Sequence, residues 1–235
     1  MSSSLMHIYL IEAGPRLLAG MSEESSAHAE QFLREMGVNI LLNKRVVDYR
    51  DHKVVLEDGT EIATRTFIWV SGVTGVTIGN LDASLIGRGG RIKVDSFNRV
   101  EGMNNVFAIG DQCIQLADEN YPNGHPQLAQ VAIQQGELLA KNLIRMEKGQ
   151  EMKPFHYRNL GSMATVGRNR AVAEFSKVKM QGWFAWVMWL VVHLRSILGV
   201  RNKVIVLLNW VWNYFTYDQS MRMICLLYTS DAADE

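Results

Sequence analysis

Residues 107–111 have the sequence Phe-Ala-Ile-Gly-Asp, and this run constrains the fold more than any other part of the chain. The apolar residues predict a buried strand that ends at Gly110 and Asp111. A helix is predicted to begin near Pro126, shortly after that strand. In open α/β sheets, ligands bind at the carboxyl ends of strands, so we expect the carboxylate of Asp111 to face a ligand there. Gly110 would let another backbone or the ligand come close.

The elements predicted for the first 71 residues follow one another as strand, helix, strand, antiparallel meander and strand. They cover residues 7–11, 22–36, 38–42, 46–49, 53–56, 61–63 and 66–71. Ser22 is a typical helix cap, and Asp58-Gly59 is a typical hairpin turn. This order is that of the second half of a Rossmann-type domain. Glu12 follows the first strand, where such folds hold an adenosine ribose, although an exposed loop glutamate would look the same.

Apolar residues recur with a period of 3.6 between residues 128 and 145, which predicts an amphipathic helix. The unpaired amide groups and the dipole at its amino end would attract an anion. Residues 155–157 and 162–166 are predicted to be strands.

Composition narrows the possible classes of protein. The 235 residues have zero net charge, but residues 151–224 carry 10 basic and 3 acidic side chains. No cluster of basic and aromatic residues suits nucleic acid, so no nucleic-acid partner is expected. Two widely spaced cysteines and scattered histidines support no disulfide framework and no metal site, and they fit a reducing compartment. The first residues lack the pattern of a signal peptide.

Several runs of residues resemble the type II NADH:quinone oxidoreductases, which are single-subunit flavoproteins. They are residues 68–75, 92–95, 99–100, 104–111, 129–136 and 157–172. The resemblance extends over residues 7–224. It implies an α/β fold, namely part of a tandem Rossmann-type flavoprotein with two dinucleotide-binding domains, plus C-terminal amphipathic membrane helices.

The resemblance implies FAD and NADH as cofactors and a quinone as the partner that accepts two electrons, without proton pumping. It places Gly110 and Asp111 at the ribityl or diphosphate part of FAD, and it favours Glu12 as the ribose ligand of NADH. The residues that it places nearest the flavin are Gly72, Leu128, Ala129 and Gln130. It also makes Gln130 and Gln134 the candidate catalytic residues beside the quinone pocket.

The chain from Trp183 to Val192 has ten consecutive apolar residues, and five of the six tryptophans lie between residues 183 and 212. Tryptophan favours the membrane–water interface. His193 and Arg195 interrupt the run, which makes a membrane span marginal. We therefore expect two interfacial helices lying on the lipid surface, as monotopic anchors at the cytoplasmic face of a bacterial inner membrane. A spanning hairpin and an apolar homodimer interface are the alternatives.

Four segments are expected. They are residues 1–75 (the C-terminal half of an NADH-binding domain), 76–180 (the C-terminal part of an FAD-binding domain), 181–224 (the anchoring helices) and 225–235 (a non-native tail). No Gly-x-Gly-x-x-Gly motif precedes Glu12, so we expect a fragment truncated at its N-terminus that binds FAD weakly or not at all and is inactive alone. A soluble flavoprotein reductase and an inactive membrane-associated fragment remain the alternatives.

Overall fold

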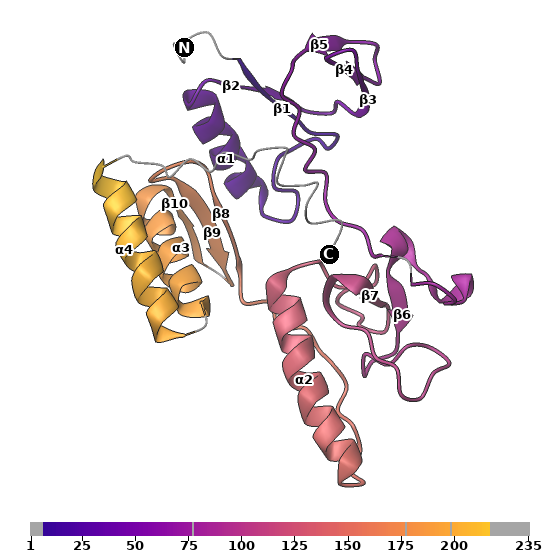
Figure 1. Ribbon diagram of the computed structural model, residues 1–235. Coiled ribbons are helices and arrows are strands. Elements are labelled where there is room, and N and C mark those ends of the chain that lie inside the picture. The colour runs from indigo at the N-terminus through magenta and orange to yellow at the C-terminus, as the bar shows by residue number, and fades with distance from the viewer. Residues whose placement is uncertain (1–6, 77, 177, 198, 217–235) are drawn as a thin grey trace, which may run out of the picture. The chain divides into compact units, whose positions relative to one another are not determined.

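The computed structural model describes residues 7–76, 78–176, 178–197 and 199–216. The chain divides into two compact units, whose elements are labelled in Figure 1. In its described part, the first unit joins residues 7–44 to residues 162–216, and the second unit is the intervening chain, residues 45–161.

The first unit begins with a strand–helix–strand motif. Strands β1 (Ile8–Ile11) and β2 (Val38–Leu41) pair in parallel, and α1 (Glu23–Glu35) connects them. Ser22 caps α1 by accepting a hydrogen bond from its first turn, and Gly37 leaves the helix with φ +83°. Apolar side chains of the two strands, of α1 and of the segments that flank them form the core: Leu10, Leu17, Leu18, Leu33, Val38, Ile40 and Leu42. The predictions for residues 7–42 are confirmed.

A three-stranded antiparallel sheet forms the rest of the first unit together with two helices. Its order is β10 (Val178–Gln181), β9 (Ala171–Phe175) and β8 (Ser162–Thr165). Helix α3 (Gly182–Ser196) packs on this sheet, where Ala171, Ala173 and Ala185 are completely buried. These small side chains let the helix approach the strands closely. The predicted strand at 162–166 is confirmed, whereas β9 and β10 had no predicted counterparts.

Helix α4 (Val200–Thr216) follows α3, and aromatic rings join the two helices. Trp189 lies against Trp210, with ring centroids 6.2 Å apart, and Trp186 lies 5.7 Å from Tyr214. Both predicted Trp-rich helices are therefore present. None of the helices in the described part of the chain has the length and hydrophobicity needed to cross a bilayer. Residues 217–224 of the predicted anchor and the predicted tail at 225–235 lie outside the described residues.

Strand β9 and Arg170, the residue before it, hold α1 at both ends through opposite charges. At the amino end of the helix, the Glu174 carboxylate accepts hydrogen bonds from the Ser22 backbone N–H (3.0 Å) and from the Ser25 hydroxyl (2.6 Å). At the carboxyl end, Arg170 donates to the Phe32 carbonyl (3.3 Å) and pairs with Glu35 (2.8 Å). A carboxylate at the positive end and a guanidinium at the negative end both complement the helix dipole.

Replacing Glu174 with glutamine is expected to lower the stability of the first unit by about 1 kcal/mol, because charge-assisted capping bonds are lost. Urea unfolding measures the change. Glu30→Gln is the matched control, since it removes a carboxylate that only bonds to exposed Arg34 one helical turn away. The control should change the stability by at most about 0.5 kcal/mol. Equal effects of the two substitutions would contradict a capping role for Glu174.

The second unit begins with a meander of three strands: β3 (Val46–Arg50), β4 (Lys53–Leu56) and β5 (Glu61–Ala63). Gly59 forms the turn before β5 with φ +84°, and its N–H donates to the Leu56 carbonyl. The predicted meander and its Asp-Gly turn are confirmed.

The structure corrects the prediction for residues 107–109, which do not form a strand. Phe107 makes only a single antiparallel bridge, with Arg99, and Gly110 takes φ +65°, which an extended strand excludes. The short 3-10 helix η4 (Gly110–Gln112) follows, and then β7 (Cys113–Gln115) pairs in parallel with β6 (Ile92–Val94). Asp111 therefore precedes a strand instead of ending one.

The predicted strand at residues 66–71 is also wrong. A strand needs a neighbour for its backbone hydrogen bonds, and no strand of the described chain pairs with this run. The side chains that a buried strand would hide are instead 60–84% exposed at Ile68, Trp69 and Val70.

Helix α2 (Ala129–Glu147) confirms the helix predicted at 128–145. The chain then returns along α2 as an irregular extended run, residues 151–161, which we name the return segment. Residues 155–157 in it were predicted to form a strand, and this is wrong. Side-chain amides of α2 bind its backbone at Lys153 and Arg158, and the Phe155 N–H donates to the Ser96 carbonyl (2.7 Å), but no strand of the described chain pairs with it. The domain boundaries predicted at 75 and 180 stay predictions.

Candidate functional site

The Gly-Asp turn lies directly against helix α2. The Gly110 N–H donates a 2.7 Å hydrogen bond to the side chain of buried Gln135. A Cβ atom at Gly110 would lie 3.2 Å from the Cβ of Ala132, so a side chain here would press on the helix. Asp111, the next residue, is exposed and can be reached by a ligand. Glycine thus permits both the positive φ and the close approach of α2.

A second segment is bound to this turn by the side chain of Gln112. Its amide nitrogen donates to the Val76 carbonyl (2.7 Å), and its oxygen accepts from the Val76 N–H (2.9 Å). Residues 68–75, one of the runs that resemble the family, therefore lead directly to the Gly-Asp turn; we name them the crossing segment. Gly72 in this segment has φ +105°, and the space around its missing side chain is open.

The Gly-Arg-Gly-Gly loop, residues 87–90, completes this corner of the second unit. The Gly75 N–H donates to the Gly89 carbonyl (2.8 Å), and a Cβ atom on Gly75 would lie only 2.4 Å from the Gly90 oxygen. The sequence alone assigns no role to this loop. The sequence signal for this contact is that Gly75 on one segment and Gly89 and Gly90 on the other all lack a side chain. Only glycine lets two backbones approach so closely.

Leu128 is the N-cap residue of α2; its backbone is extended, and the residue is 41% exposed. No side chain of the described chain caps this end, so the amides of Ala129 and Gln130 remain available to a ligand, whereas the Val131 N–H donates to the Leu128 carbonyl (2.9 Å). Ala129 in that turn is exposed as well. An uncapped helix end of this kind attracts negative charge.

Gln130 and Gln134, the predicted catalytic residues, both hold the return segment against α2. Gln130 donates to the Gly161 carbonyl (3.0 Å) and accepts from the Leu160 N–H (3.1 Å). Gln134 binds both backbone groups of Arg158, at 2.9 and 3.1 Å. Their amides thus take the place of a neighbouring strand, and their catalytic role stays a prediction.

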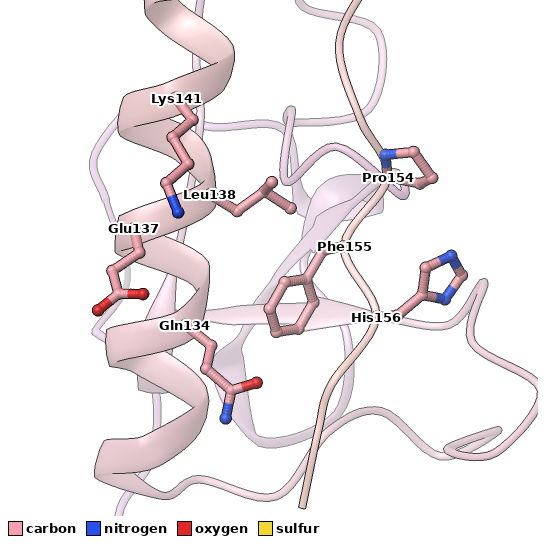
Figure 2. A pocket seen from close by; sticks show the side chains of 7 residues that line it. All are labelled: Gln134, Glu137, Leu138, Lys141, Pro154, Phe155 and His156. Atoms are coloured by element: carbon pink, nitrogen blue, oxygen red, sulfur yellow. The ribbon is translucent and has the colours of Figure 1, made fainter.

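A third amide continues this arrangement towards the end of α2. Buried Asn142 donates to the Lys153 carbonyl (2.8 Å) and accepts from its N–H (2.9 Å). Between these bonds lies a shallow groove of about 290 Å³. Figure 2 shows Leu138 pointing from the helix towards the return segment, whereas His156 points away from the helix.

The buried pair of Asp118 and His125 was missed by sequence reasoning. The His125 Nε2 lies 3.0 Å from an Asp118 carboxylate oxygen, and both side chains are at most 4% exposed. The hydrogen bond from His125 lowers the pKa of the Asp118 carboxyl below its usual value, although burial opposes this. The residues are seven positions apart in an irregular loop, so no periodic pattern indicated their contact.

Cys113 offers no thiolate for redox exchange. The thiol is buried at the start of β7, and burial raises its pKa above the usual value, although hydrogen bonds to Gln135 and Asn98 act in the opposite direction. A neutral, buried thiol is a poor nucleophile.

Glu12 belongs to the first unit and lies where β1 ends. Its carboxylate accepts a 2.7 Å hydrogen bond from the Gly14 N–H, and its backbone carbonyl accepts from the Lys44 N–H. The acidic residue therefore stands at the carboxyl end of a parallel strand, as the sequence predicts. Its role as a ribose ligand stays a prediction.

Comparison with known proteins identifies the family. The pyridine nucleotide-disulphide oxidoreductase family matches residues 2–136, and the NDH2 C-terminal domain matches residues 159–217. The chain therefore belongs to the pyridine nucleotide-disulphide oxidoreductase family.

Within this family, the chain is similar to NADH:quinone and NAD(P)H-ubiquinone oxidoreductases. The chain is 35% identical over 216 residues to the type II NADH:quinone oxidoreductase NdhA of Mycobacterium tuberculosis, covering 86% of this chain and 44% of that protein. It is 32% identical over 227 residues to the mitochondrial internal alternative NAD(P)H-ubiquinone oxidoreductase A1 of Arabidopsis thaliana, covering 89% and 44%. The predicted resemblance to type II NADH:quinone oxidoreductases is confirmed. The chain spans less than half the length of these relatives.

Solved structures confirm the predicted fold class. The NDH2 of Plasmodium falciparum, determined in complex with NADH, matches 92% of this chain and 60% of its own with a TM-score of 0.81 and 18% identity. The sulfide:quinone oxidoreductase of Aquifex aeolicus matches 90% of this chain and 54% of its own with a TM-score of 0.64 and 15% identity.

Proposed function

We propose that this chain forms the part of a type II NADH:quinone oxidoreductase that contacts the flavin and the membrane. The observation that carries the proposal is one corner of the second unit. There, the Gly110-Asp111 turn, the crossing segment and the uncapped end of α2 come together. The similarity to NADH:quinone oxidoreductases over most of the chain supports the same conclusion.

The residues at this corner fit FAD. Asp111 is exposed and acidic, which suits the hydroxyl groups of a ribityl chain. The amides of the first turn of α2 suit the negative charge that a flavin carries near its pyrimidine ring when reduced. When bound, FAD supplies hydride acceptance and electron transfer, and the protein supplies position and electrostatic stabilisation.

We assign the NADH contact to the first unit. Glu12 stands at the carboxyl end of β1, the place where dinucleotide folds hold a ribose. Its negative charge would repel a 2′-phosphate, which favours NADH over NADPH.

The proposed membrane contact is the exposed side of α3 and α4. Its apolar side chains include Trp183, Phe184, Val191, Leu208, Val211, Trp212 and Phe215. Arg195 lies in the last turn of α3 and Arg201 in the first turn of α4, on either side of the connection between the two helices. Each would add about 1 kcal/mol of attraction to anionic lipid. We infer that the two helices lie in the interface at the cytoplasmic face of the membrane, where a quinone is supplied from the lipid.

Replacing Trp212 with glutamate is expected to weaken binding to vesicles of anionic lipid about tenfold, because a 62% exposed ring no longer enters the lipid. Co-sedimentation with the vesicles measures the binding. Val47→Glu is the control, since Val47 is an exposed apolar residue (55%) on β3 in the second unit. Equal loss in both variants would contradict a membrane role for α4.

The activity is tested by mixing the full-length protein that carries this chain with NADH and a short-chain quinone analogue. NADH oxidation that depends on the quinone is expected. Oxidation with a ferredoxin or a disulfide as acceptor, and none with the quinone, would overturn the proposal.

A further inference from the structure

His125 is held from three directions by groups that the proposed reaction does not use. Its ring Nε2–H donates to the Asp118 carboxylate, and its backbone carbonyl accepts a 3.0 Å hydrogen bond from Arg91. The same guanidinium also donates to the Cys113 carbonyl at the start of β7 (2.6 Å). Three aromatic rings surround the imidazole, with centroids 5.1–5.9 Å away: Tyr121, Phe155 and Tyr157.

Asp118 and His125 close a loop that is itself folded tightly. The Asp118 side chain accepts from the Asn120 N–H, and its carbonyl accepts from the Tyr121 N–H. Gly124 then passes over β7 with φ +86°, at a place where a Cβ atom would lie 2.6 Å from the Ile114 side chain. The loop is therefore packed closely on β7, and the His125–Asp118 hydrogen bond joins its two ends.

This fastened loop leads directly into α2. Pro126 follows His125, and the helix begins at Ala129, four residues after the histidine. The position of His125 thus determines where the first turn of α2 lies. Because no side chain of the described chain caps that turn, its amides depend on the preceding loop for their place.

We propose that Asp118 and His125 are positioning residues for the flavin, which aim the first-turn amides of α2 at the charge of the reduced isoalloxazine. This inference rests on the proposed function. A buried polar pair contributes little net stability compared with apolar residues of similar size, but its hydrogen bond fixes direction. Displacement of a preorganised donor by a fraction of an ångström weakens electrostatic stabilisation.

The test compares His125→Leu with His125→Gln. The leucine fills the space without a hydrogen bond, whereas the glutamine amide nitrogen can take the place of Nε2 and restore the bond to Asp118. Asn142→Ala is the matched control, because it removes two hydrogen bonds of a buried side chain towards the far end of the same helix.

Two readouts are used. Amide hydrogen exchange of Val131 and Ala132, whose N–H groups donate to the Leu128 carbonyl, is measured in this chain, and the flavin midpoint potential is measured in the full-length, FAD-loaded protein. His125→Leu is expected to speed exchange of the first turn about tenfold and to make reduced flavin about tenfold less favoured. That change corresponds to about −30 mV for a two-electron couple. His125→Gln should restore both values to near wild type, and Asn142→Ala should leave the potential unchanged.

The outcomes separate this inference from the proposed function. A wild-type protein that binds no flavin overturns the proposed function and this inference with it. Bound flavin whose potential is the same in His125→Leu and wild type overturns the positioning role alone. An equal shift in Asn142→Ala also overturns it, since loss of stability anywhere in α2 would then be sufficient.

Discussion

Replacing Gly75 with alanine is expected to lower the stability of the second unit by about 1–3 kcal/mol, the usual range for overpacking. The added Cβ atom would lie 2.4 Å from the Gly90 oxygen. That oxygen belongs to the backbone, so it cannot rotate away as a side chain can. The crossing segment and the Gly-Arg-Gly-Gly loop must therefore separate.

The same substitution is expected to weaken FAD binding in the full-length protein at least about tenfold, which is 1.4 kcal/mol. Separation of the two segments would strain the bonds between Val76 and Gln112, which follows Asp111 in the turn. Urea unfolding measures the stability, and titration with FAD measures the affinity.

Gly79→Ala is the matched control for this prediction. Gly79 lies four residues along the same loop, and a Cβ atom there would meet nothing within 4 Å. This variant should unfold and bind FAD as the wild type does. If Gly75→Ala were as stable as Gly79→Ala, the two segments would not be packed as described.

Replacing Asp111 with asparagine is expected to reduce FAD affinity about tenfold to a hundredfold while leaving stability almost unchanged. A hydrogen bond to a charged group contributes about 1.5–3 kcal/mol, and a carboxylate accepts hydroxyl groups more strongly than an amide does. Asp111 is exposed, so the folded protein does not depend on its charge.

Flavin fluorescence during titration measures this affinity, and thermal unfolding checks the stability. Asp48→Asn is the control, because it removes an exposed carboxylate from β3 in the same unit. Unchanged affinity in Asp111→Asn would remove this carboxylate from the flavin site. A large loss of stability would show instead that the residue holds the turn together.

Elements governed by local rules could be predicted from the sequence. Ser22 begins a helix because its side chain accepts from the first turn, and Gly37 ends it because glycine tolerates a positive φ. The turn at Asp58-Gly59 follows the same logic. The helix at 129–147 could be predicted because its apolar residues recur with the helical period of 3.6. In each case, the residues within a few positions decide the structure.

Elements governed by distant partners could not be predicted in the same way. The apolar run at 66–71 has the composition of a strand. A strand also needs a neighbouring strand for its backbone hydrogen bonds, and composition does not indicate whether one is present. Gly110 was expected to end a strand because the residues before it are apolar. The Ala108 N–H instead donates to the Asn98 carbonyl, and the Val106 carbonyl accepts from the Val100 N–H, which gives an isolated bridge and no strand.

Much of the candidate site depends on side chains that replace backbone partners. Gln112, Gln130, Gln134 and Asn142 each bind the donor and acceptor of a distant segment. An amide in a helix is usually solvated, so no local signal marks these pairs. The Asp118–His125 contact depends in the same way on how the loop folds back over β7.

The central claim is that this chain completes a flavin site that passes electrons from NADH to a quinone. The most direct measurement follows the absorbance of the bound flavin in the full-length protein under anaerobic conditions. NADH is added first, and a short-chain quinone analogue is added afterwards. We predict that the flavin bleaches with NADH and regains its absorbance with the quinone. A protein without bound flavin, or a bleached flavin that the quinone does not reoxidise, would contradict the claim.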